Sequence, residues 1–388
     1  MKKKSLLLAV SLCMALAGSY VYAKPIPQAS VNGVGFNTLS EAIQVANQYP
    51  GSTVDLLSDA SYSTTMLTFA DVTINLNGYT IYRKNSEARW YIGGAEEPED
   101  LGSSAPEVLP KIVINGGDGG KIVDADDAEG EISTPHIAVQ YADITINDVD
   151  IINKTTDEDS SAFCIRDAAN ATLNNCNLQG WAGLKIYREV GTGTSNLTVI
   201  GGSITSKVGA DTTYKSSAVL GHSDVHYDTN ILFDGVTISS ENSAAIALTP
   251  RCYVTLKDCV LTGTSGVYFT AGSLDIQGTQ IHATGEFRED APFEKDQDGA
   301  YTEDSYDGSG IQVISDNLFN EPIEITISAD SSIVSDHGYA IRELGGLDGT
   351  GESLVTVTDE GAELTGEQGE ICLAEPVEAA EAEENPAA

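Results

Sequence analysis

An eight-residue phrase recurs along this chain: apolar, any, apolar, any, then Asp, Asn or Gly, a small residue, any, apolar. Its clearest copies are ITINDVDI at 144–151, ATLNNCNL at 171–178, LTVIGGSI at 197–204, ILFDGVTI at 231–238, VTLKDCVL at 254–261 and LDIQGTQI at 274–281. The alternation with period two predicts a short strand in each copy. Because the copies follow one another every 20 to 34 residues, they indicate a solenoid in which each repeat buries its apolar side against its neighbours.

A second series of short strands alternates with the first. Its members are AFCIRD from 162, GLKIYR from 183, AVLGH from 218, AIALT from 245, GVYFT from 266, GIQVI from 310 and YAIREL from 339. Two or three short strands per turn, joined by tight polar corners, predict an all-β chain folded as a parallel β-helix of about ten coils. At about 4.8 Å per coil the rod would be roughly 50 Å long.

The first 23 residues have the features of a signal peptide. Lys2, Lys3 and Lys4 precede an apolar run at 6–17, and Val21 and Ala23 occupy the small-residue positions of a cleavage site. The run is too short to span a membrane. We therefore expect an exported protein, located outside the cell, at the cell surface or in the periplasm, without membrane insertion.

Residues 24–34 are expected to form a leader, and a short helix follows it. Thr38 and Glu41 form a capping box, and Pro50 stops the helix. Its apolar face consists of Leu39, Ala42, Ile43 and Ala46. A helix at this place would cover the open end of the solenoid.

Two stretches interrupt the β-helix domain, which we expect to cover residues 24–373. Residues 93–110 are rich in acid, Gly and Pro, and residues 286–308 contain nine acids and two bases. Both are expected to be loops that leave the wall of the solenoid. Residues 374–388 are acidic and rich in Ala and Pro, which predicts a disordered tail.

Without the signal peptide the chain has 17 basic and 58 acidic residues, a net charge of −41. Such a charge repels nucleic acid and anionic lipid and attracts cations. It also disfavours uronic-acid polymers, which need a basic cleft. We expect a monomer that does not bind nucleic acid.

Five cysteines follow the signal peptide, so at least one thiol is unpaired. Cys176 and Cys259 occupy the same position of the phrase, roughly 14 Å apart when the coils are stacked, which is beyond disulfide reach. We interpret both as small apolar core residues.

Three segments resemble the pectate-lyase-like superfamily of right-handed parallel β-helix proteins, in particular its bacterial surface and secreted repeat members. They are FNTLSEAIQVANQYPGSTVDLL at 36–57, NLNGYTI at 75–81 and the repeated phrase. The resemblance covers residues 36–372 and implies a single-stranded right-handed parallel β-helix with a short N-terminal capping helix. These motifs specify a fold, because lyases, hydrolases, esterases and adhesin stalks share the scaffold.

Lyases of this superfamily use an Arg or Lys base beside carboxylates that hold calcium, and its hydrolases use Asp pairs near a His. When the second series is aligned by sequence, Arg166 falls in line with Tyr187, Gly221, Thr249, Thr270, Ile314 and Arg342. Two arginines among neutral residues do not form a cluster of carboxylates and a base.

The stretch GHSDVHYD is the nearest candidate for catalysis. Alternation places His222, Asp224, His226 and Asp228 on one side of an extended segment, an arrangement suited to metal binding or acid/base work. The alternative is a polar corner whose side chains face water.

Calcium is the cofactor that the acidic loops would hold. Acids in the second insertion imitate the first, third and fifth positions of a calcium loop, although the twelfth position holds a serine. The candidate ligands are Glu294, Asp296, Asp298, Glu303 and Asp304. DADDAEGE from Asp124 is a second acidic run, and the alternative for both is solvated charge on a loop.

Four aromatic residues that lie close in sequence are the candidates for binding sugar rings: Tyr79, Tyr82, Trp90 and Tyr91. Their rings could stack on a polysaccharide, or they could fill the space between an early coil and the loop after it.

The sequence favours an exported, non-catalytic, adhesin-like β-helix protein that binds a polysaccharide or a host or cell-surface protein. The alternative is a calcium-assisted polysaccharide lyase or glycoside hydrolase, which would need a cleft lined by carboxylates and one Arg or Lys. A third hypothesis is a structural passenger of a larger transported protein.

Overall fold

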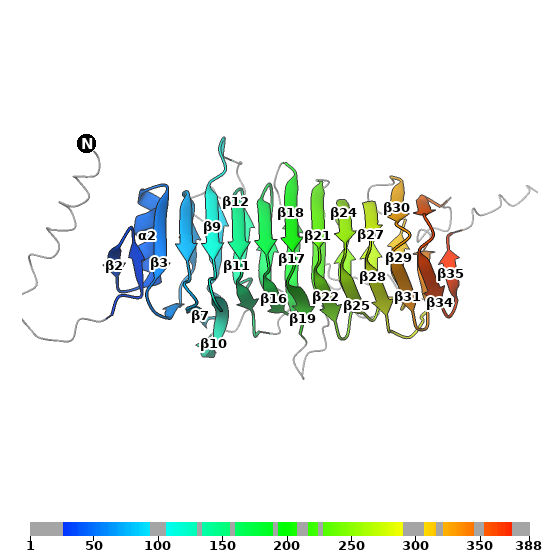
Figure 1. The fold of residues 1–388 in the computed structure, drawn as a ribbon, viewed down its shortest axis with the longest axis horizontal. Helices are drawn as coiled ribbons and strands as arrows, with labels where there is room; N and C mark the ends of the chain where they lie inside the picture. Colours follow the sequence, from blue (N-terminus) through cyan, green and yellow to red (C-terminus); the bar gives the residue numbers. More distant parts are fainter. Residues whose placement is uncertain are drawn as a thin grey trace, which may run out of the picture.

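The computed structural model describes residues 26–93, 106–129, 134–155, 160–188, 193–207, 216–223, 228–289, 306–315, 321–344 and 353–374. These residues form a parallel β-helix, an elongated rod with its coils stacked along one axis (Figure 1). Eleven coils are described, and each contributes one strand to each of three long sheets, A, B and C. The predicted fold is confirmed, with one coil more than the estimate of about ten.

Sheet A has thirteen strands, eleven of them parallel. In spatial order they are β2 (Val34–Phe36), β1 (Ala29–Val31), β3 (Ser52–Leu56), β6 (Val72–Asn75), β9 (Lys111–Asn115), β12 (Asp143–Asn147), β15 (Asn170–Asn174), β18 (Ser195–Ile200), β21 (Thr229–Asp234), β24 (Cys252–Lys257), β27 (Gly272–Gln277), β30 (Ile323–Ile327) and β33 (Val355–Asp359).

Sheet B has eleven strands. They are β4 (Ala60–Tyr62), β7 (Thr80–Asn85), β10 (Lys121–Glu129), β13 (Asp150–Ile152), β16 (Asn177–Gly180), β19 (Ser203–Ser206), β22 (Thr237–Ser240), β25 (Val260–Gly263), β28 (Gln280–Ala283), β31 (Ser332–Ser335) and β34 (Glu363–Gly366).

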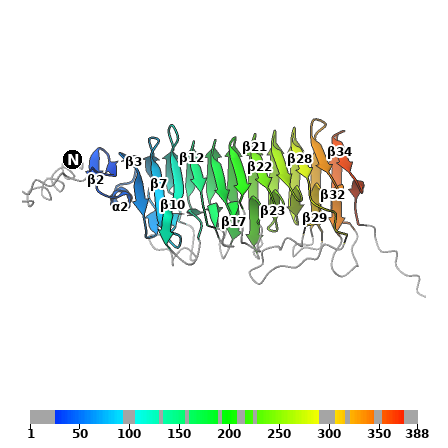
Figure 2. The same cartoon turned by 90° about the horizontal axis from the view of Figure 1, so that it is seen from below.

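Sheet C also has eleven strands. They are β5 (Met66–Thr68), β8 (Trp90–Gly93), β11 (Ile137–Gln140), β14 (Ser161–Ile165), β17 (Ala182–Arg188), β20 (Val219–Ser223), β23 (Ile246–Leu248), β26 (Val267–Phe269), β29 (Ile311–Ile314), β32 (Tyr339–Leu344) and β35 (Gly369–Cys372). Seen from below, the coils keep the same order from α2 (Leu39–Gln48) at one end to β34 near the other (Figure 2).

The corner between sheets A and B explains the repeated phrase. Its first half forms a strand of sheet A, its last residues form a strand of sheet B, and its fifth residue turns the chain. That residue has a positive φ of 50° to 67° in all six clear copies: Asp148, Asn175, Gly201, Gly235, Asp258 and Gly278. Asp, Asn and Gly are the residues that tolerate this conformation, so backbone geometry dictates the Asp/Asn/Gly position.

The interior is filled by ladders of aliphatic residues from equivalent positions of successive coils. In sheet A, for example, Ile114 pairs with Ile146 and Ile146 with Leu173, and all three are fully buried. Cys176 and Cys259 are also buried, and both are free thiols, as are the other three cysteines of the described residues. Burial raises the pKa of the Cys176 thiol to about 11, which keeps it neutral and unreactive.

The N-terminal end is capped as predicted. Thr38 precedes α2 in an extended conformation, and its Oγ1 accepts a hydrogen bond from the Glu41 amide at 3.2 Å. The buried face of α2 consists of Leu39, Ala42, Ile43 and Ala46. The prediction of a leader at 24–34 is wrong from residue 29 onward, because β1 and β2 form a hairpin that pairs with β3 in the antiparallel sense. Asn32 and Gly33, both with positive φ, form its two-residue turn.

Part of the second insertion packs on the outer face of sheet C. The Tyr306 ring meets the Tyr268 ring edge-on with centroids 5.7 Å apart, and its hydroxyl lies 3.1 Å from the Ser217 hydroxyl. Next to it, the buried Asp307 forms an ion pair with Arg342 at 3.1 Å. These contacts hold the returning chain against the wall.

Several predicted segments lie outside the described residues: the signal peptide, the tail from 375, and the central parts of both insertions, 94–105 and 290–305. Within the described ranges, no helix has the length and apolar character needed to cross a membrane.

Candidate functional site

The stretch from His222 to Asp228 is only partly described. His222 lies on β20, while Asp224 and His226 fall outside the described residues. The Asp228 carboxylate accepts a hydrogen bond from Arg251 Nε at 2.6 Å, and Arg251 also pairs with Glu321 at 3.0 Å. Asp228 therefore belongs to an ion-pair network, and the proposed role of the other three residues stays a prediction.

The five predicted calcium ligands, Glu294, Asp296, Asp298, Glu303 and Asp304, also lie outside the described residues. The second acidic run is described as far as Glu129, and this part belongs to strand β10, where the Asp126 and Asp127 side chains are exposed to solvent. Asp126 pairs with Lys154 at 2.6 Å and Asp127 pairs with Lys84 at 2.8 Å, while Asp124 is buried. The acids of this run neutralise neighbouring cations.

The four predicted sugar-binding aromatics do not form one platform. Trp90 is fully buried, and its Nε1 donates a hydrogen bond to Thr68 Oγ1 at 2.8 Å. Tyr91 is 9% exposed on the other face of the same strand, and its hydroxyl accepts a hydrogen bond from Arg89 at 2.8 Å. Tyr82 lies on β7 of sheet B, and Tyr79, which is 37% exposed, lies just before that strand. Packing accounts for Trp90 and Tyr91.

The strand register corrects the column that we aligned by sequence. Residues in line with Arg166 are Tyr187, His222, Thr249, Thr270, Ile314 and Leu344. Gly221 is one residue too early, and Arg342, which pairs with Gln312, is two residues too early. Because coil lengths vary, sequence alignment alone could not fix this register.

Cations and aromatic rings gather on the outer face of sheet C near its N-terminal end. The guanidinium of Arg89 lies 5.3 Å from the centre of the Tyr91 ring, and that of Arg166 lies 5.2 Å from the Tyr187 ring. Lys185 Nζ approaches the same Tyr187 ring at 5.6 Å. Residues from different strands of the sheet form this group, so no local sequence motif predicts it.

A second feature that the sequence did not reveal is a buried polar cluster at the end of sheet B. Tyr62, Arg83, Asp124 and Asn153 occupy one register position in four successive coils, and His136 joins them from the chain before β11. Arg83 Nε lies 2.6 Å from Asp124 Oδ1, and His136 Nε2 lies 3.4 Å from the same oxygen. The charged members are at most 1% exposed, so the cluster is structural.

The environment sets the charges in this cluster. Burial alone would raise the pKa of Asp124, but hydrogen bonds from His136 and Arg83 and the charge of Arg83 outweigh it and hold the pKa well below the usual range. Burial, with the Arg83 charge, lowers the pKa of His136. Asp124 is therefore ionised at neutral pH and His136 is neutral.

The outer face of sheet A is regular and polar. From β3 to β15, outward Asn side chains join successive coils: Asn75 donates to Asp55 at 2.8 Å, Asn115 to Asn75 at 2.9 Å, Asn147 to Asn115 at 2.8 Å and Asn174 to Asn147 at 2.8 Å. A parallel ladder links Asn170 to Asp143, Asn196 to Asn170 and Asn230 to Asn196 at 2.6 to 2.8 Å. Because these amides bond to each other, the ladders primarily stiffen the wall.

The first ladder ends at Asn174 on β15 and the second at Asn230 on β21. After Asn230 the outward column continues with Tyr253 and Ser273.

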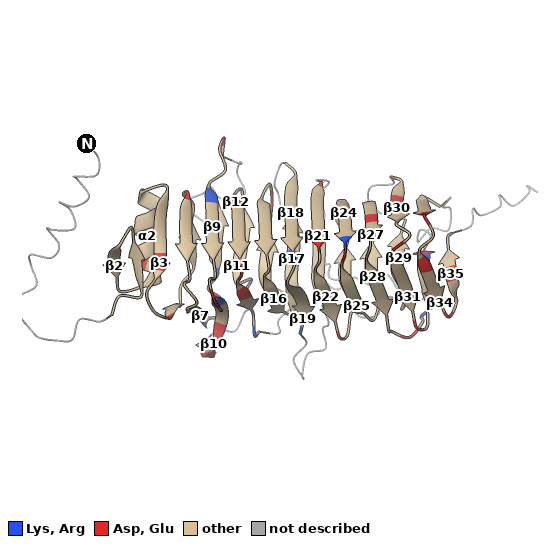
Figure 3. Cartoon of the chain, viewed as in Figure 1, with Lys and Arg blue, Asp and Glu red and all other residues tan. Residues whose placement is uncertain are grey.

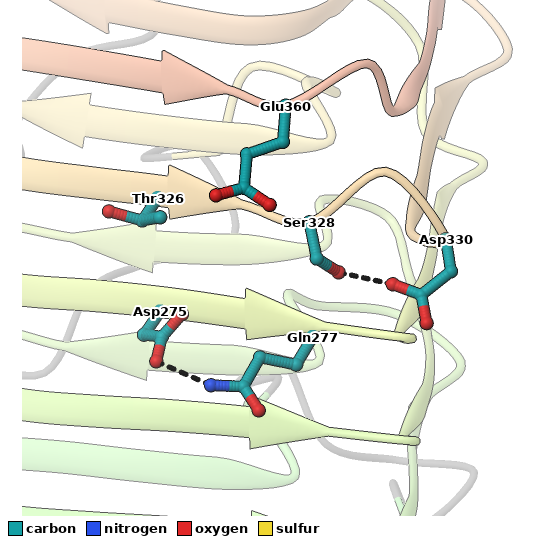
Figure 4. Close-up of a pocket in the computed structure, with 6 residues that line it drawn as sticks. All are labelled: Asp275, Gln277, Thr326, Ser328, Asp330 and Glu360. Carbon is teal, nitrogen blue, oxygen red and sulfur yellow. Dashed lines mark hydrogen bonds between the residues drawn. The ribbon is translucent and has the colours of Figure 1, made fainter.

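Two shallow depressions lie on this outer face of sheet A. The first, of about 460 Å³, is lined by Asn196, Asn230, Tyr253, Thr255, Ser273 and Asp275 among others. The second, of about 360 Å³, is lined by Asp275, Gln277, Thr326, Ser328, Asp330 and Glu360 (Figure 4). Asp275 belongs to both, so the two depressions adjoin; we call them together the sheet A face.

Hydrogen bonds fix the polar groups of the second depression. Gln277 Nε2 donates to Asp275 Oδ2 at 2.7 Å, and the Ser328 hydroxyl donates to Asp330 (Figure 4). The amide of Gly278 donates to Ser328 Oγ at 3.1 Å and to Asp330 Oδ1 at 3.2 Å. The Ser328 hydrogen bond lowers the pKa of Asp330. This carboxylate is therefore ionised at neutral pH.

The sheet A face combines carboxylates, amides and hydroxyls with an exposed aromatic ring. The second depression presents the three carboxylates of Asp275, Asp330 and Glu360, and no Lys or Arg lines it. Among the described residues, no three His, Cys, Asp or Glu side chains are placed to hold a metal ion. The face offers hydrogen-bonding groups and one exposed ring, that of Tyr253, which is 40% exposed.

No protein-family model, curated protein or solved structure matches this chain.

Proposed function

We propose that this chain is an exported, non-catalytic protein of the pectate-lyase-like β-helix type that binds a neutral glycan on the sheet A face. The observation that carries the proposal is the exposed Tyr253 ring, set between Asn230 and Ser273 on a flat polar wall and bordering a depression. Export rests on the signal peptide that the first 23 residues predict.

An aromatic ring surrounded by hydroxyl and amide groups suits a sugar. The apolar face of a pyranose packs on an exposed ring, and its hydroxyls need donors and acceptors nearby. Thr255, Ser273 and Asp275 supply these groups around Tyr253. The rigid wall beneath them limits the conformational entropy lost on binding.

Charge selects among glycans. A uronic-acid or sulfated chain would meet Asp275, Asp330 and Glu360, with no cation lining the second depression. The whole chain adds a net charge of −38. A neutral glycan avoids both sources of repulsion.

The dimensions of the face suit an oligosaccharide segment. The two depressions extend from β18 to the end of β33, six successive strands of sheet A. At about 4.8 Å between strands this distance is roughly 24 Å. Such a face can contact several sugar residues at once, so that weak individual contacts add up.

The test is a panel of neutral and anionic polysaccharides offered to the purified mature chain, with and without calcium, in which binding and product release are read together. We expect binding to a neutral member and no cleavage. Tyr253→Ala should weaken this binding by roughly tenfold or more, a loss of about 1.4 kcal/mol. Tyr49→Ala is the matched control, because Tyr49 is similarly exposed (44%) but lies beside α2.

Release of reducing ends or unsaturated products would contradict the non-catalytic assignment. Equal affinity of the Tyr253→Ala variant and the parent chain would remove the sheet A face as the binding site.

A further inference from the structure

The last coil of the solenoid ends in open strand edges. β33, β34 and β35 are the terminal strands of sheets A, B and C, and each pairs with only one neighbour among the described residues. On the other side, alternate backbone N–H and C=O groups of each strand point along the axis of the rod. Unpaired edges of this kind are templates for the addition of another strand.

The interior of the last coil is also incompletely covered. Val357, Leu364 and Ile371 continue the core ladders of the three sheets, stacked on Ile325, Ile333 and Ile341. The residues beneath are at most 1% exposed, whereas the three of the last coil are only partly buried, and Ile371 is 42% exposed. An added strand with inward apolar residues would bury all three.

The charge of this coil is one-sided. Residues 353–374 contain five acids and no Lys or Arg: Asp359, Glu360, Glu363, Glu367 and Glu370. Figure 3 shows red segments recurring at this end of the rod. Glu363 and Glu370 directly precede the inward residues Leu364 and Ile371, so they lie on the outer side of the same edge strands.

Three candidates could occupy the edge of the last coil: the tail of this chain, a second copy, or a segment of a different protein. Their charges distinguish them. Residues 375–388 of this chain contain five acids and no base, and a second copy would bring the same five acids of its own last coil; both would be repelled. The capped N-terminal end of another copy offers α2 in place of a free strand edge. A basic segment from a different protein is attracted.

We propose that the last coil is a strand-addition site for a partner protein segment in which apolar and basic residues alternate. Its backbone pairs with the edge of β34 or β35, and its apolar side chains extend the ladder that ends at Leu364 or Ile371. Its basic side chains lie opposite Glu363 or Glu370, where cross-strand pairs of opposite charge stabilise the register. This site is separate from the sheet A face and does not depend on the glycan proposal.

The test uses the mature chain and a blocked ten-residue peptide of alternating Val and Lys. Hydrogen exchange followed by mass spectrometry should show that amides at 355–372 exchange more slowly with peptide than in the free chain, because the peptide protects those that do not face β30, β31 and β32. The same peptide with alternate N-methyl amides keeps its charge but cannot pair fully, and it should give no protection. Sedimentation velocity should find a monomer.

Two charge-matched variants separate a specific site from general attraction. Glu363→Gln with Glu370→Gln should weaken peptide binding by about tenfold at physiological salt. Glu107→Gln with Asp118→Asn, which neutralises two exposed acids far from this end, should leave it unchanged. Equal losses of peptide affinity in both double variants would overturn the proposal. Exchange at 355–372 that is equally slow with and without peptide, or a dimer that buries this segment, would overturn it as well, in favour of the chain itself or a second copy.

Discussion

The first coils and the last coils of this solenoid are built from the same repeat, yet they differ in what surrounds it. At the N-terminal end, α2 and the β1–β2 hairpin cover the first coil, the asparagine ladders stiffen sheet A, and Arg83 and Asp124 form a buried ion pair. Toward the C-terminal end the ladders stop, two depressions open, and the final strands pair on one side only among the described residues. The two ends therefore differ in how completely the terminal coil is covered and in where the outer wall carries depressions.

The largest expected effect concerns the buried ion pair. Arg83→Ala would leave Asp124 charged in the interior without its main partner, and we expect a loss of about 3–5 kcal/mol in stability. Arg251→Ala removes a partly exposed partner of Asp228 in the C-terminal half and should cost less than about 1 kcal/mol. Urea unfolding monitored by circular dichroism measures both. Similar losses would contradict the larger contribution that we expect from the buried ion pair.

A smaller effect distinguishes the last coil from the coil before it. Ile341 and Ile371 pair in register, but Ile341 is fully buried and Ile371 is 42% exposed. Ile341→Ala should cost about 2–5 kcal/mol because it leaves a cavity. Ile371→Ala should cost under about 1 kcal/mol. Hydrogen exchange of β32 and β35 in the two variants provides the measurement, and equal costs would mean that the end of the rod is covered.

The pH dependence should have opposite signs in the two halves. His136 has a lowered pKa, chiefly through burial, so below pH about 6.5 the unfolded chain binds a proton that the folded chain does not. The pKa of Asp124 is also lowered, so the folded chain loses further stability as pH falls below about 4. The N-terminal half should therefore lose stability on acidification.

The stability contributed by His337, near the C-terminal end, has the opposite pH dependence. The Glu367 hydrogen bond raises the pKa of His337. The stability that His337 contributes is therefore present below pH about 6.5 and is lost as pH rises through the raised pKa. Local hydrogen exchange at pH 5 and pH 8, with His136→Gln and His337→Gln as the variants, checks the two signs. The same sign at both places would contradict these assignments.

Much of the fold could be predicted because each part of the repeated phrase indicates one backbone conformation. Its alternation specifies a strand, and its Asp, Asn or Gly marks a corner with positive φ, as at Asp148. The single hairpin at Asn32 and Gly33 carries the Asn-Gly signal of a two-residue turn, although the sequence contains no series of such hairpins. The earliest coils carry only loose copies of the phrase, which explains the low estimate of their number.

The candidate site was harder to predict because it depends on register. Arg83 and Asp124 are 41 residues apart, and only the length of the intervening coil brings them into contact. Tyr253 comes one residue before the phrase at 254–261, so alternation does point it outward. What the sequence could not show is that the depressions border this ring, since that requires the neighbouring coils to be placed.

The most direct test of the glycan proposal is oxidative footprinting of tyrosines with a bound neutral polysaccharide. Tyr49, Tyr79 and Tyr253 are exposed to similar extents, 44%, 37% and 40%, and they lie in different parts of the rod. We expect the glycan to slow oxidation of Tyr253 and to leave oxidation of the other two tyrosines unchanged. Protection of Tyr79 without protection of Tyr253 would contradict it and return the site to the aromatic cluster first indicated by the sequence.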